Sequence, residues 1–343
     1  MPRPGESSTT SDPELRTDSQ LILELYERML LIRTVEERLK EEYASRRIRG
    51  PVHLSIGQEA IAVGVLHACQ PADVCVSTHR NHAHYLAKGG SLAGMVDELY
   101  GLDTGCCHGY GGSMHLVDRN VNFLLSGAIV AGSVPIAVGV AFALKRDGAT
   151  RVCVSFGGDG ATDEGVFYEA LNLAALLELP VFFVIENNGI STLTPYAKRQ
   201  ALPDAVGKAK RFGVEGMTVD GNDVLEVHAA AKQILERMRQ TSEPFLLEAV
   251  TYRLCDHVGP VVYTSGIGAD EELQTRIERE PLKVLTARIQ ADYPELARQC
   301  ESRAQAVRDE VHDAFERAKA RFDEEAVRVG LPPPPPPPDP RRV

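Results

Sequence analysis

Hydrophobic residues recur at helical spacing near the start of the chain. From Ser19 onward, apolar positions return every three or four residues with Glu and Arg between them, which is typical of a long amphipathic helix. A second helix is predicted to start with a capping box at 55–58 and to run to about Cys69. Small apolar residues over 134–144 predict a third, closely packed helix.

Two short, almost wholly apolar runs predict buried strands on either side of a helix. The runs are 152–156 and 181–185, and the helix between them ends near Pro180. A strand–helix–strand unit of this kind has parallel strands and a right-handed crossover. A helix over 224–238 and a strand over 245–252 continue the alternation. The pattern predicts an α/β fold of three layers, a mostly parallel sheet with helices on both faces.

The chain divides into four predicted regions. Residues 1–18 are rich in Pro, Ser, Thr and charge and are expected to form a disordered arm, while 329–343 hold a proline run and are expected to be a disordered tail. Between them we expect a main domain over 19–270 and a helical C-terminal extension over 271–328. Within the domain, 101–135 is dense in glycine without a clear period, which predicts a long, buried loop.

Composition narrows the class of protein. The 343 residues are 43% hydrophobic, enough for a large core, and a formal net charge of -11 disfavours nucleic acid as a partner. Seven cysteines without a CxxC pair argue against a disulfide framework and a structural zinc site. The chain has no apolar stretch near the ~18 residues of a membrane span, and its N-terminus lacks the apolar core of a signal peptide. We therefore expect a cytoplasmic protein with reduced thiols and no membrane partner.

Each strand of the central unit is followed by a candidate metal ligand. Asp159 follows the first strand and Asn188 the second, at the edge where ligands of parallel sheets gather. A carboxylate and an amide oxygen suit Mg²⁺, which completes its coordination with water and phosphate oxygens. Gly158 and Gly160 leave room for a phosphate at the start of the next helix. A Gly-Asp-Gly triplet alone is most often a turn, but this arrangement predicts a magnesium-bound diphosphate.

These residues resemble a known family. The segment from Gly158–Asp159–Gly160 to Asn187–Asn188 is similar to the thiamin diphosphate and magnesium motif of thiamin-dependent enzymes. From about residue 20 to 270, the chain resembles the alpha subunit of the E1 component of 2-oxo acid dehydrogenases, and Thr78–His79–Arg80 is similar to its acetoin dehydrogenase branch. Further motifs in the family's order lie at 53–60, 111–115, 160–165, 219–224, 251–253 and 256–260.

The resemblance implies how the cofactor would be bound. Asp159, Asn188 and the main-chain carbonyl of Ile190 match the magnesium ligands. Arg80 matches the arginine that grips the diphosphate, and His79 lies on the same side of the cofactor. The remaining matches are backbone donors beside the phosphates and supports of the aminopyrimidine: Gly160, Ala161, Ala128 and Val130.

The resemblance also implies catalytic histidines. His257 matches the active-site histidine near the diphosphate and the reacting carbon, and His53 matches a histidine that faces the substrate. Simpler readings stay open: Arg80 in a surface ion pair, and His257 in a loop ion pair with Asp256. The other histidines of the motifs, whose spacing matches no complete metal site, are interpreted as structural: His82, His84 and His115.

The family's reaction implies cofactors and partners. Thiamin diphosphate and Mg²⁺ would be the cofactors, and a separate E1 beta subunit, in an α2β2 heterotetramer, would supply a glutamate that this chain lacks. The enzyme would decarboxylate a 2-oxo acid or cleave an acyloin and transfer the acyl unit to a lipoyl group of E2 or to another acceptor. Because 261–265 departs from the family's loop, substrate and E2 docking stay open. The alternatives are a non-catalytic scaffold subunit, a specialised carboligase or acyl-transfer enzyme of a biosynthetic pathway and, less favoured, a phosphohydrolase using Asp159.

Overall fold

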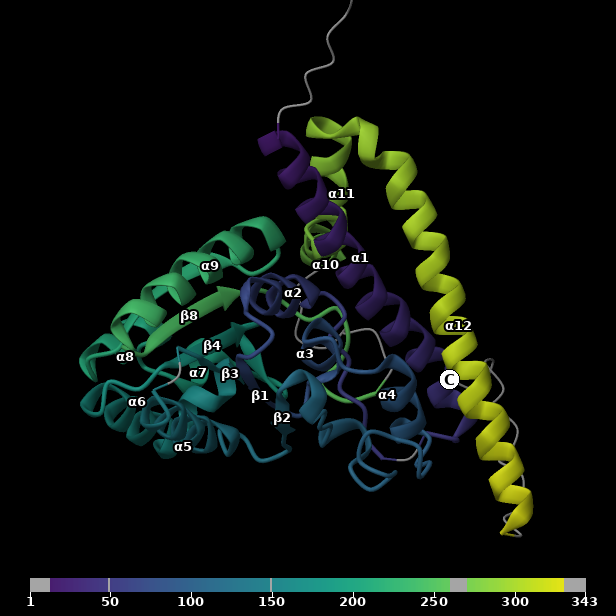
Figure 1. Ribbon diagram of the computed structural model, residues 1–343, viewed down its shortest axis with the longest axis horizontal. Helices are drawn as coiled ribbons and strands as arrows, with labels where there is room; N and C mark the ends of the chain where they lie inside the picture. The colour runs from purple at the N-terminus through teal and green to yellow at the C-terminus, as the bar shows by residue number, and fades with distance from the viewer. Residues whose placement is uncertain (1–12, 49, 149, 260–269, 330–343) are drawn as a thin grey trace, which may run out of the picture.

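Six parallel strands form one sheet at the centre of the structure, which is a computed structural model (Figure 1). The residues that it describes are 13–48, 50–148, 150–259 and 270–329. The strands of the sheet are β1 (Val74–Ser77), β2 (Phe123–Ser126), β3 (Cys153–Gly158), β4 (Val181–Asn187), β7 (Glu215–Asp220) and β8 (Phe245–Val250). Their order across the sheet is β2-β1-β3-β4-β8-β7, and every neighbouring pair is parallel.

Helices cover both faces of this sheet. Against one face pack α1 (Pro13–Glu42), α2 (Glu59–Ala68), α3 (His82–Ala87) and α9 (Val224–Thr241), and against the other pack α5 (Ser133–Arg146), α6 (Gly165–Leu176) and α8 (Ala205–Arg211). Strand side chains alternate between the two cores: Phe182 and Val184 of β4 join the first, and Phe183 and Ile185 join the second. A strand buried on both faces needs such a continuous apolar run. The predicted three-layer α/β fold is confirmed.

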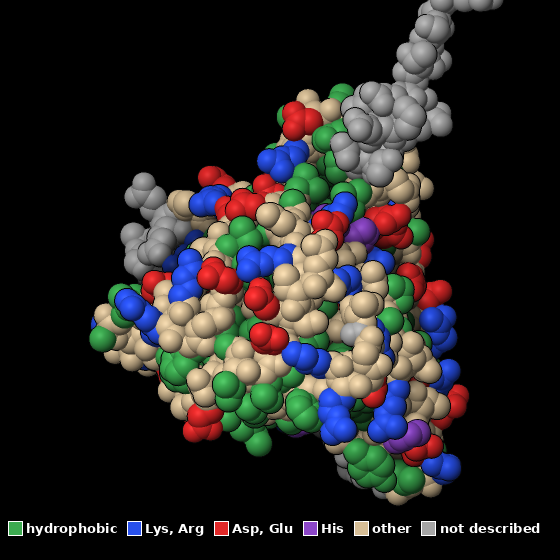
Figure 2. Space-filling view, turned by 60° about the vertical axis from the view of Figure 1, so that its left-hand side comes forward, with side chains coloured by type: hydrophobic (Ala, Val, Ile, Leu, Met, Phe, Trp, Pro, Cys, Tyr) green, Lys and Arg blue, Asp and Glu red, His purple; other side chains and the backbone are tan. Residues whose placement is uncertain are grey.

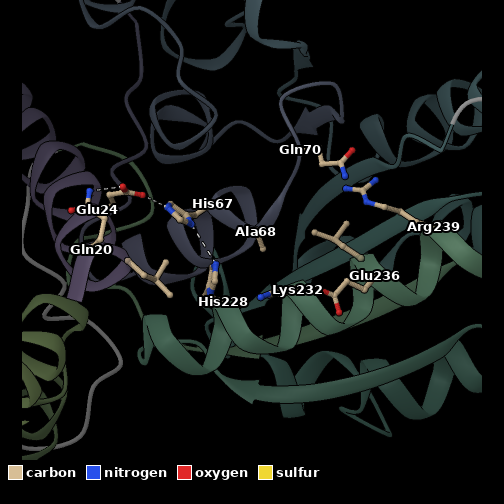
Figure 3. A pocket seen from close by; sticks show the side chains of 11 residues that line it. Gln20, Glu24, His67, Ala68, Gln70, His228, Lys232, Glu236 and Arg239 are labelled. Atoms are coloured by element: carbon tan, nitrogen blue, oxygen red, sulfur yellow. Dashed lines mark hydrogen bonds and ion pairs between the residues drawn. The ribbon is translucent and has the colours of Figure 1, made fainter. Parts of the chain in front are cut away.

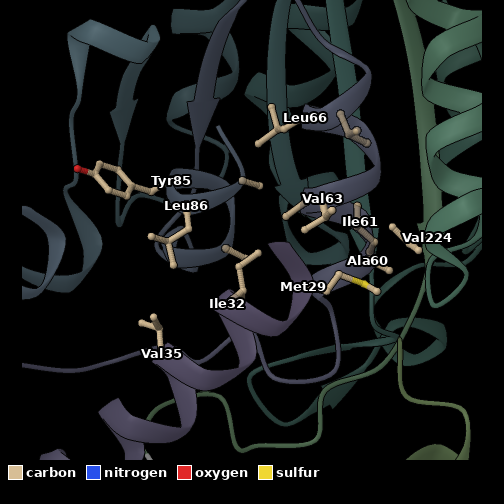
Figure 4. Packing of buried hydrophobic residues seen from close by; sticks show 14 of the residues in the cluster. Met29, Ile32, Val35, Ala60, Ile61, Val63, Leu66, Tyr85, Leu86 and Val224 are labelled. Carbon is tan, nitrogen blue, oxygen red and sulfur yellow. The ribbon is translucent and has the colours of Figure 1, made fainter. Parts of the chain in front are cut away.

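The first core continues from the sheet into the C-terminal helices. Figure 4 shows Met29 and Ile32 of α1 directed toward α2, where Ile61 and Val63 lie. The segment predicted as a helical extension holds three helices, and the last packs along α1 (Figure 1): α10 (Asp270–Glu278), α11 (Pro281–Asp292) and α12 (Ala297–Arg328). Because Leu285 of α11 and Phe315 of α12 are buried in the same core, these two helices share one hydrophobic core with the main domain.

The ends of the chain differ in part from the prediction. The first helix begins at Pro13 rather than at Ser19, so the last residues of the predicted disordered arm are helical. The rest of the arm, the loop at 261–265 and the proline run of the predicted tail lie outside the described residues.

The predicted capping box at the start of α2 is wrong. The helix begins only at Glu59, and its N-cap residue Gln58 makes no capping hydrogen bond with its side chain. Ser55 instead donates its backbone N–H to the Glu36 carboxylate at 2.9 Å, and its hydroxyl makes no hydrogen bond within the described atoms. Gln58 accepts a hydrogen bond from Asn188, so a residue interpreted as a cap belongs to the site.

Three strands of the central sheet were not anticipated: β1, β2 and β7. The predicted loop over 101–135 contains β2, which pairs with β1 in parallel through an irregular register. β2 and β7 are the two edges of the sheet, where fewer side chains need to be buried and the apolar pattern is weak. β1 is only four residues long, and sequence periodicity does not separate so short a run from a loop.

All seven cysteines are free, and three of them are fully buried or nearly so in the strands and in the loop after β8: Cys75, Cys153 and Cys255. Across the described parts of the chain, no helix combines the length and apolar character that crossing a membrane requires.

Candidate active site

All eleven residues predicted for the site line one cavity of about 190 Å³, which we call the strand-end cavity. It lies where β3 and β4 end, at the edge of the sheet where parallel folds bind ligands. The predicted residues in its lining are His53, His79, Arg80, Ala128, Val130, Asp159, Gly160, Ala161, Asn188, Ile190 and His257. Segments far apart in the chain therefore converge as predicted, while the role of each residue stays a prediction.

Asp159 lies directly after β3, at the first position of the 3-10 helix η4 (Asp159–Asp163). Asp159 is 2% exposed, and burial raises the pKa of its carboxyl group, although the positive charge of Arg199 acts in the opposite direction. Arg199, at the end of α7 (Tyr196–Arg199), forms ion pairs with both Asp159 and Asp163. A divalent ion that binds Asp159 therefore competes with the Arg199 guanidinium for this carboxylate.

Asn188 follows β4, next to β3 in the sheet. Its Nδ2 donates to Gln58 Oε1 at 2.9 Å, which leaves Oδ1 as the side-chain acceptor, and Oδ1 accepts from the backbone N–H of Ile190 at 3.3 Å. Asp159, Asn188 and Ile190 all line the strand-end cavity. An acid, an amide oxygen and a main-chain carbonyl form an oxygen-only donor set, which fits Mg²⁺ rather than a softer metal.

Gly160 is required by packing within the protein. A Cβ atom on it would lie 2.7 Å from the hydroxyl oxygen of Ser191, in the short hairpin of β5 (Ile190–Ser191) and β6 (Thr194–Pro195). At Gly158 the nearest atom would be 4.0 Å away, so nothing in the protein itself excludes a side chain there. The glycines therefore allow η4 to approach the hairpin closely as well as leaving space at the cavity.

Arg80 is a buried cation in the cavity wall. It is 6% exposed, and its guanidinium donates to the main-chain carbonyls of Leu54 and of His257, the latter at 3.2 Å. Burial, and then the charge of Arg253, lower its pKa to about 10, so it remains charged at neutral pH. The surface ion pair considered for Arg80 is wrong, since the residue is buried and the hydrogen bonds of its guanidinium go to carbonyls. A buried guanidinium oriented in this way fits an anionic ligand such as a diphosphate.

Three imidazoles meet in the same cavity. The ring centroids of His53 and His79 are 4.6 Å apart, those of His53 and His257 5.1 Å, and those of His79 and His257 5.5 Å. Burial is the main cause that lowers the pKa of His53 to about 2, of His79 to about 3 and of His257 to about 4, and the charge of Arg80 contributes to each. All three rings are therefore neutral at pH 7 and can accept a hydrogen bond or bind a ligand.

The histidines interpreted as structural have structural partners. His82 hydrogen-bonds to Glu36 at 3.2 Å and to Ser113 at 2.9 Å, and His84 stacks on Phe156 with ring centroids 3.8 Å apart. The ion pair considered between His257 and Asp256 is not present among the described residues, where Asp256 Oδ1 has no hydrogen-bond partner.

Several functional residues were missed by the sequence analysis. Arg199 carries no motif that would mark it, and Arg253 lies inside a motif whose role was not assigned. The glycine-rich loop is organised by Glu98, which is 1% exposed at the end of α4 (Leu92–Leu99). Its carboxylate accepts four backbone N–H groups, those of Cys107, Gly109, Gly111 and Gly112, at 2.7–2.9 Å. This loop leads to Met114, which lines the cavity.

A larger cavity, of about 670 Å³, lies between α1, α2 and α9 (Figure 3). His67 is its central side chain, 3.0 Å from Glu24 and 3.3 Å from His228. Charged residues of both signs surround it, including Lys232 and Glu236. None of the predicted site residues lines this cavity, so its size does not make it the better candidate.

Acid is expected to destabilise the chain through its buried histidines. Native His53, His79 and His257 stay neutral, whereas unfolded histidines take up protons below about pH 6.5. The unfolded state then binds more protons, so the free energy of unfolding falls as the pH falls from about 6.5 toward 4. Thermal unfolding at about pH 7.5 and 5.5 should show this loss, and it should be smaller in His53→Asn. An equal loss in both proteins would contradict the low pKa of His53.

The chain has clear relatives. The family model described as "Dehydrogenase E1 component" matches residues 27–326. The chain is similar to the pyruvate dehydrogenase E1 component subunit alpha of Porphyra purpurea, at 37% identity over 84% of this chain and 85% of that protein. It is also similar to the acetoin:2,6-dichlorophenolindophenol oxidoreductase subunits alpha of Bacillus subtilis, at 43% identity over 68% and 70% of the two chains, and of Cupriavidus necator, at 38% over 80% and 90%. The predicted resemblance is confirmed: the chain belongs to the dehydrogenase E1 component family, among its alpha subunits.

Proposed function

We propose that this chain binds thiamin diphosphate with Mg²⁺ in the strand-end cavity and is the alpha subunit of an E1-type enzyme. The enzyme decarboxylates a 2-oxo acid or cleaves an acyloin and passes the acyl unit to a lipoyl group or another acceptor. The observation that carries the proposal is the convergence of all eleven predicted residues on one cavity at the strand ends. The names of the relatives support an oxidoreductase, and they include both pyruvate and acetoin types.

Different residues of the cavity bind the metal ion and the diphosphate. Asp159, Asn188 and Ile190 hold Mg²⁺ through oxygen atoms, with Arg199 released from Asp159 in exchange. Arg80 binds the diphosphate, because its guanidinium is buried in the cavity wall and oriented by two main-chain carbonyls. When bound, thiamin diphosphate supplies a nucleophilic carbon and an electron sink.

The residues also provide for proton transfer. His257 and His53 are neutral at pH 7, and because their pKa values are about 4 and about 2, each takes up a proton only when negative charge develops on the substrate beside it. The Nδ1 atom of His53 is buried without a hydrogen-bond partner among the described atoms, which leaves it available for this exchange. The His79 ring lies beside both of them, with its centroid 4.6 Å from that of His53 and 5.5 Å from that of His257, and we infer that it helps to hold the two rings in place.

We further propose that a beta subunit covers an apolar surface beside the cavity, as part of an α2β2 heterotetramer. Ile129, which lines the cavity, is 79% exposed, and Leu176 at the end of α6 is 72% exposed. Four further apolar side chains are exposed, one beside the cavity and three on the helices α5 and α6: Val130, Ile136, Phe142 and Leu173. Figure 2 shows hydrophobic side chains gathered in the lower part of that face, at the height of α5 and α6 in Figure 1. Exposed apolar side chains that extend from a site along two neighbouring helices are typical of a protein interface.

Titration of thiamin diphosphate into the purified chain tests the proposed function. We expect saturable binding by calorimetry that requires Mg²⁺, and tighter binding after a candidate beta subunit is added, because the subunit covers the exposed side of the cavity. The control is the same titration with the metal chelated. Absence of binding with and without the beta subunit would favour the non-catalytic scaffold.

A charge on the apolar surface should prevent association with the beta subunit. In Leu176→Asp, a desolvated carboxylate would replace an apolar contact, which we expect to weaken association more than about tenfold. Light scattering after size-exclusion chromatography gives the measurement. The matched control is Val327→Asp on α12, where the side chain is similarly exposed at 81% but distant in the chain from this surface. Equal association of both variants would contradict the assigned interface.

A further inference from the structure

The three cavity histidines form a set of nitrogen ligands separate from the oxygen ligands assigned to Mg²⁺. One ring nitrogen from each of His53, His79 and His257 lies within 4.8 Å of the others. They come from three separate segments: the loop before α2, the loop after β1 and the loop after β8. Their convergence is therefore a result of the tertiary fold and not of a local motif.

Buried, neutral imidazoles are good metal ligands. The pKa values of all three lie well below neutrality, so no proton must leave before a metal binds. Nδ1 of His53 is buried, lies in a residue that lines the cavity, and has no hydrogen-bond partner among the described atoms. Three histidine nitrogens with an open fourth position are a donor set that zinc takes in tetrahedral sites.

We propose that His53, His79 and His257 bind one zinc-class divalent transition-metal ion in the strand-end cavity. The donor types decide the selectivity, because imidazole suits Zn²⁺, Co²⁺ and Ni²⁺, whereas the oxygen set at Asp159 and Asn188 suits Mg²⁺. The cavity thus offers two cation sites of different chemistry, one formed by residues directly after β3 and β4, and one formed by the three histidines of the loops before α2, after β1 and after β8.

The surrounding charges determine what completes the coordination. The positive charges of Arg80 and Arg253 act on this cluster, as they do on the pKa of His79 and His257. A bare dication would be repelled by them, so the fourth ligand is an anion, such as hydroxide or inorganic phosphate, that faces the guanidinium groups. The ion and its anion then bind together as a unit of lower charge.

The other cluster with metal-binding spacing does not support such a site. Glu98, Cys106 and Cys107 also place their ligand atoms within 4.8 Å of one another. Both carboxylate oxygens of Glu98 already accept two backbone N–H groups each, and Cys107 Sγ donates to the carbonyl of His115 at 3.1 Å. The carboxylate of Glu98 and the thiol of Cys107 are therefore already used in hydrogen bonds to the glycine-rich loop.

Metal occupancy has a consequence for activity that rests on the proposed function. An ion on His53 and His257 occupies the nitrogen atoms that would exchange protons with the substrate. Zn²⁺ should therefore inhibit the assembled enzyme, and the inhibition should be competitive with the carbonyl substrate.

Titration with Co²⁺ tests the binding site without any need for activity. The full-length chain, free of Mg²⁺ and thiamin diphosphate, is expected to bind one Co²⁺ with the visible absorption of a four-coordinate nitrogen site. In His79→Ala and in His257→Ala the affinity should fall more than about tenfold, since even outer-shell partners of metals are worth about 10–100-fold. The matched control is the double variant His67→Ala and His228→Ala, which removes an imidazole pair outside this cavity and should leave the spectrum unchanged.

Two outcomes overturn the proposal. One is a chain that yields no four-coordinate Co²⁺ spectrum, and the other is a spectrum that survives all three cavity substitutions, including His53→Ala. Circular dichroism of each variant establishes that the fold is retained. Asp159→Ala separates this proposal from the proposed function, because it should keep the Co²⁺ spectrum while losing Mg²⁺-dependent binding of thiamin diphosphate. If the unsubstituted chain gives the Co²⁺ spectrum but does not bind thiamin diphosphate with Mg²⁺, the proposed function has failed, and if it binds the cofactor but gives no such spectrum, the histidine site has failed.

Discussion

Asp159→Ala is expected to abolish Mg²⁺-dependent binding of thiamin diphosphate. The carboxylate is the single charged member of the predicted ligand set, whose other members are the amide of Asn188 and the carbonyl of Ile190. Its removal leaves two neutral oxygens to hold a strongly hydrated dication, which is insufficient. We expect a loss of more than about 100-fold in cofactor affinity by calorimetry, since even second-shell changes at metal sites cost about 10–100-fold.

Asp163→Ala is the matched control for this substitution. Asp163 shares the Arg199 guanidinium with Asp159 and lies in the same 3-10 helix, but it does not line the strand-end cavity. Its removal changes the local charge by the same amount without removing a predicted ligand. Cofactor affinity should therefore stay within a few-fold of the original. If both substitutions reduced affinity equally, the effect would come from local charge and not from metal ligation.

His257→Ala is expected to leave cofactor affinity nearly unchanged and to slow turnover of the enzyme assembled with its beta subunit. The side chain is neutral at pH 7 because its pKa is lowered to about 4, and it shares the cavity with the predicted cofactor ligands. Loss of a general acid or base costs about 10²–10⁴-fold in rate. The effect should therefore appear in kcat, measured at saturating thiamin diphosphate and substrate.

The control and the pH profile make this prediction specific. His108→Ala removes an imidazole that is exposed and outside the cavity, so its turnover should match that of the original protein. In the original enzyme, the neutral form of His257 persists down to about pH 4, and a rate that depends on it should fall only as the pH approaches this value. Unchanged turnover in His257→Ala would remove the catalytic role from this residue.

Local signals were sufficient for the centre of the fold and for the positions of Asp159 and Asn188 at the cavity. The apolar runs that became β3 and β4 must be buried on both faces, and the helix between them fixes their parallel pairing. Asp159 and Asn188 follow directly from that pairing, because the residues after two adjacent parallel strands lie at the same edge. Edge strands such as β2 and β7 carried no such signal, since one side of each strand needs no partner.

Other parts of the site depended on contacts between distant segments. Arg199 reaches Asp159 from the helix after the β5–β6 hairpin, and nothing in its local sequence marks it as a partner. Gln58 looked like part of a capping box, but its side chain accepts a hydrogen bond from Asn188, and this contact between residues 130 positions apart exists only in the folded chain. Glu98 organises the glycine-rich loop through four N–H groups that only a folded loop presents.

The sequence by itself determined the alternation of strands and helices in the centre of the sheet, the positions of Asp159 and Asn188 at the strand ends and the family to which the chain belongs. These features follow from hydrophobic periodicity and from motifs that are local in the chain. Only the tertiary structure decided that three histidines from separate loops meet in one neutral cluster beside Arg80, because their pKa values are set by burial and by charges from other segments. Burial and distance between remote residues are properties of the folded chain, and no local pattern encodes them.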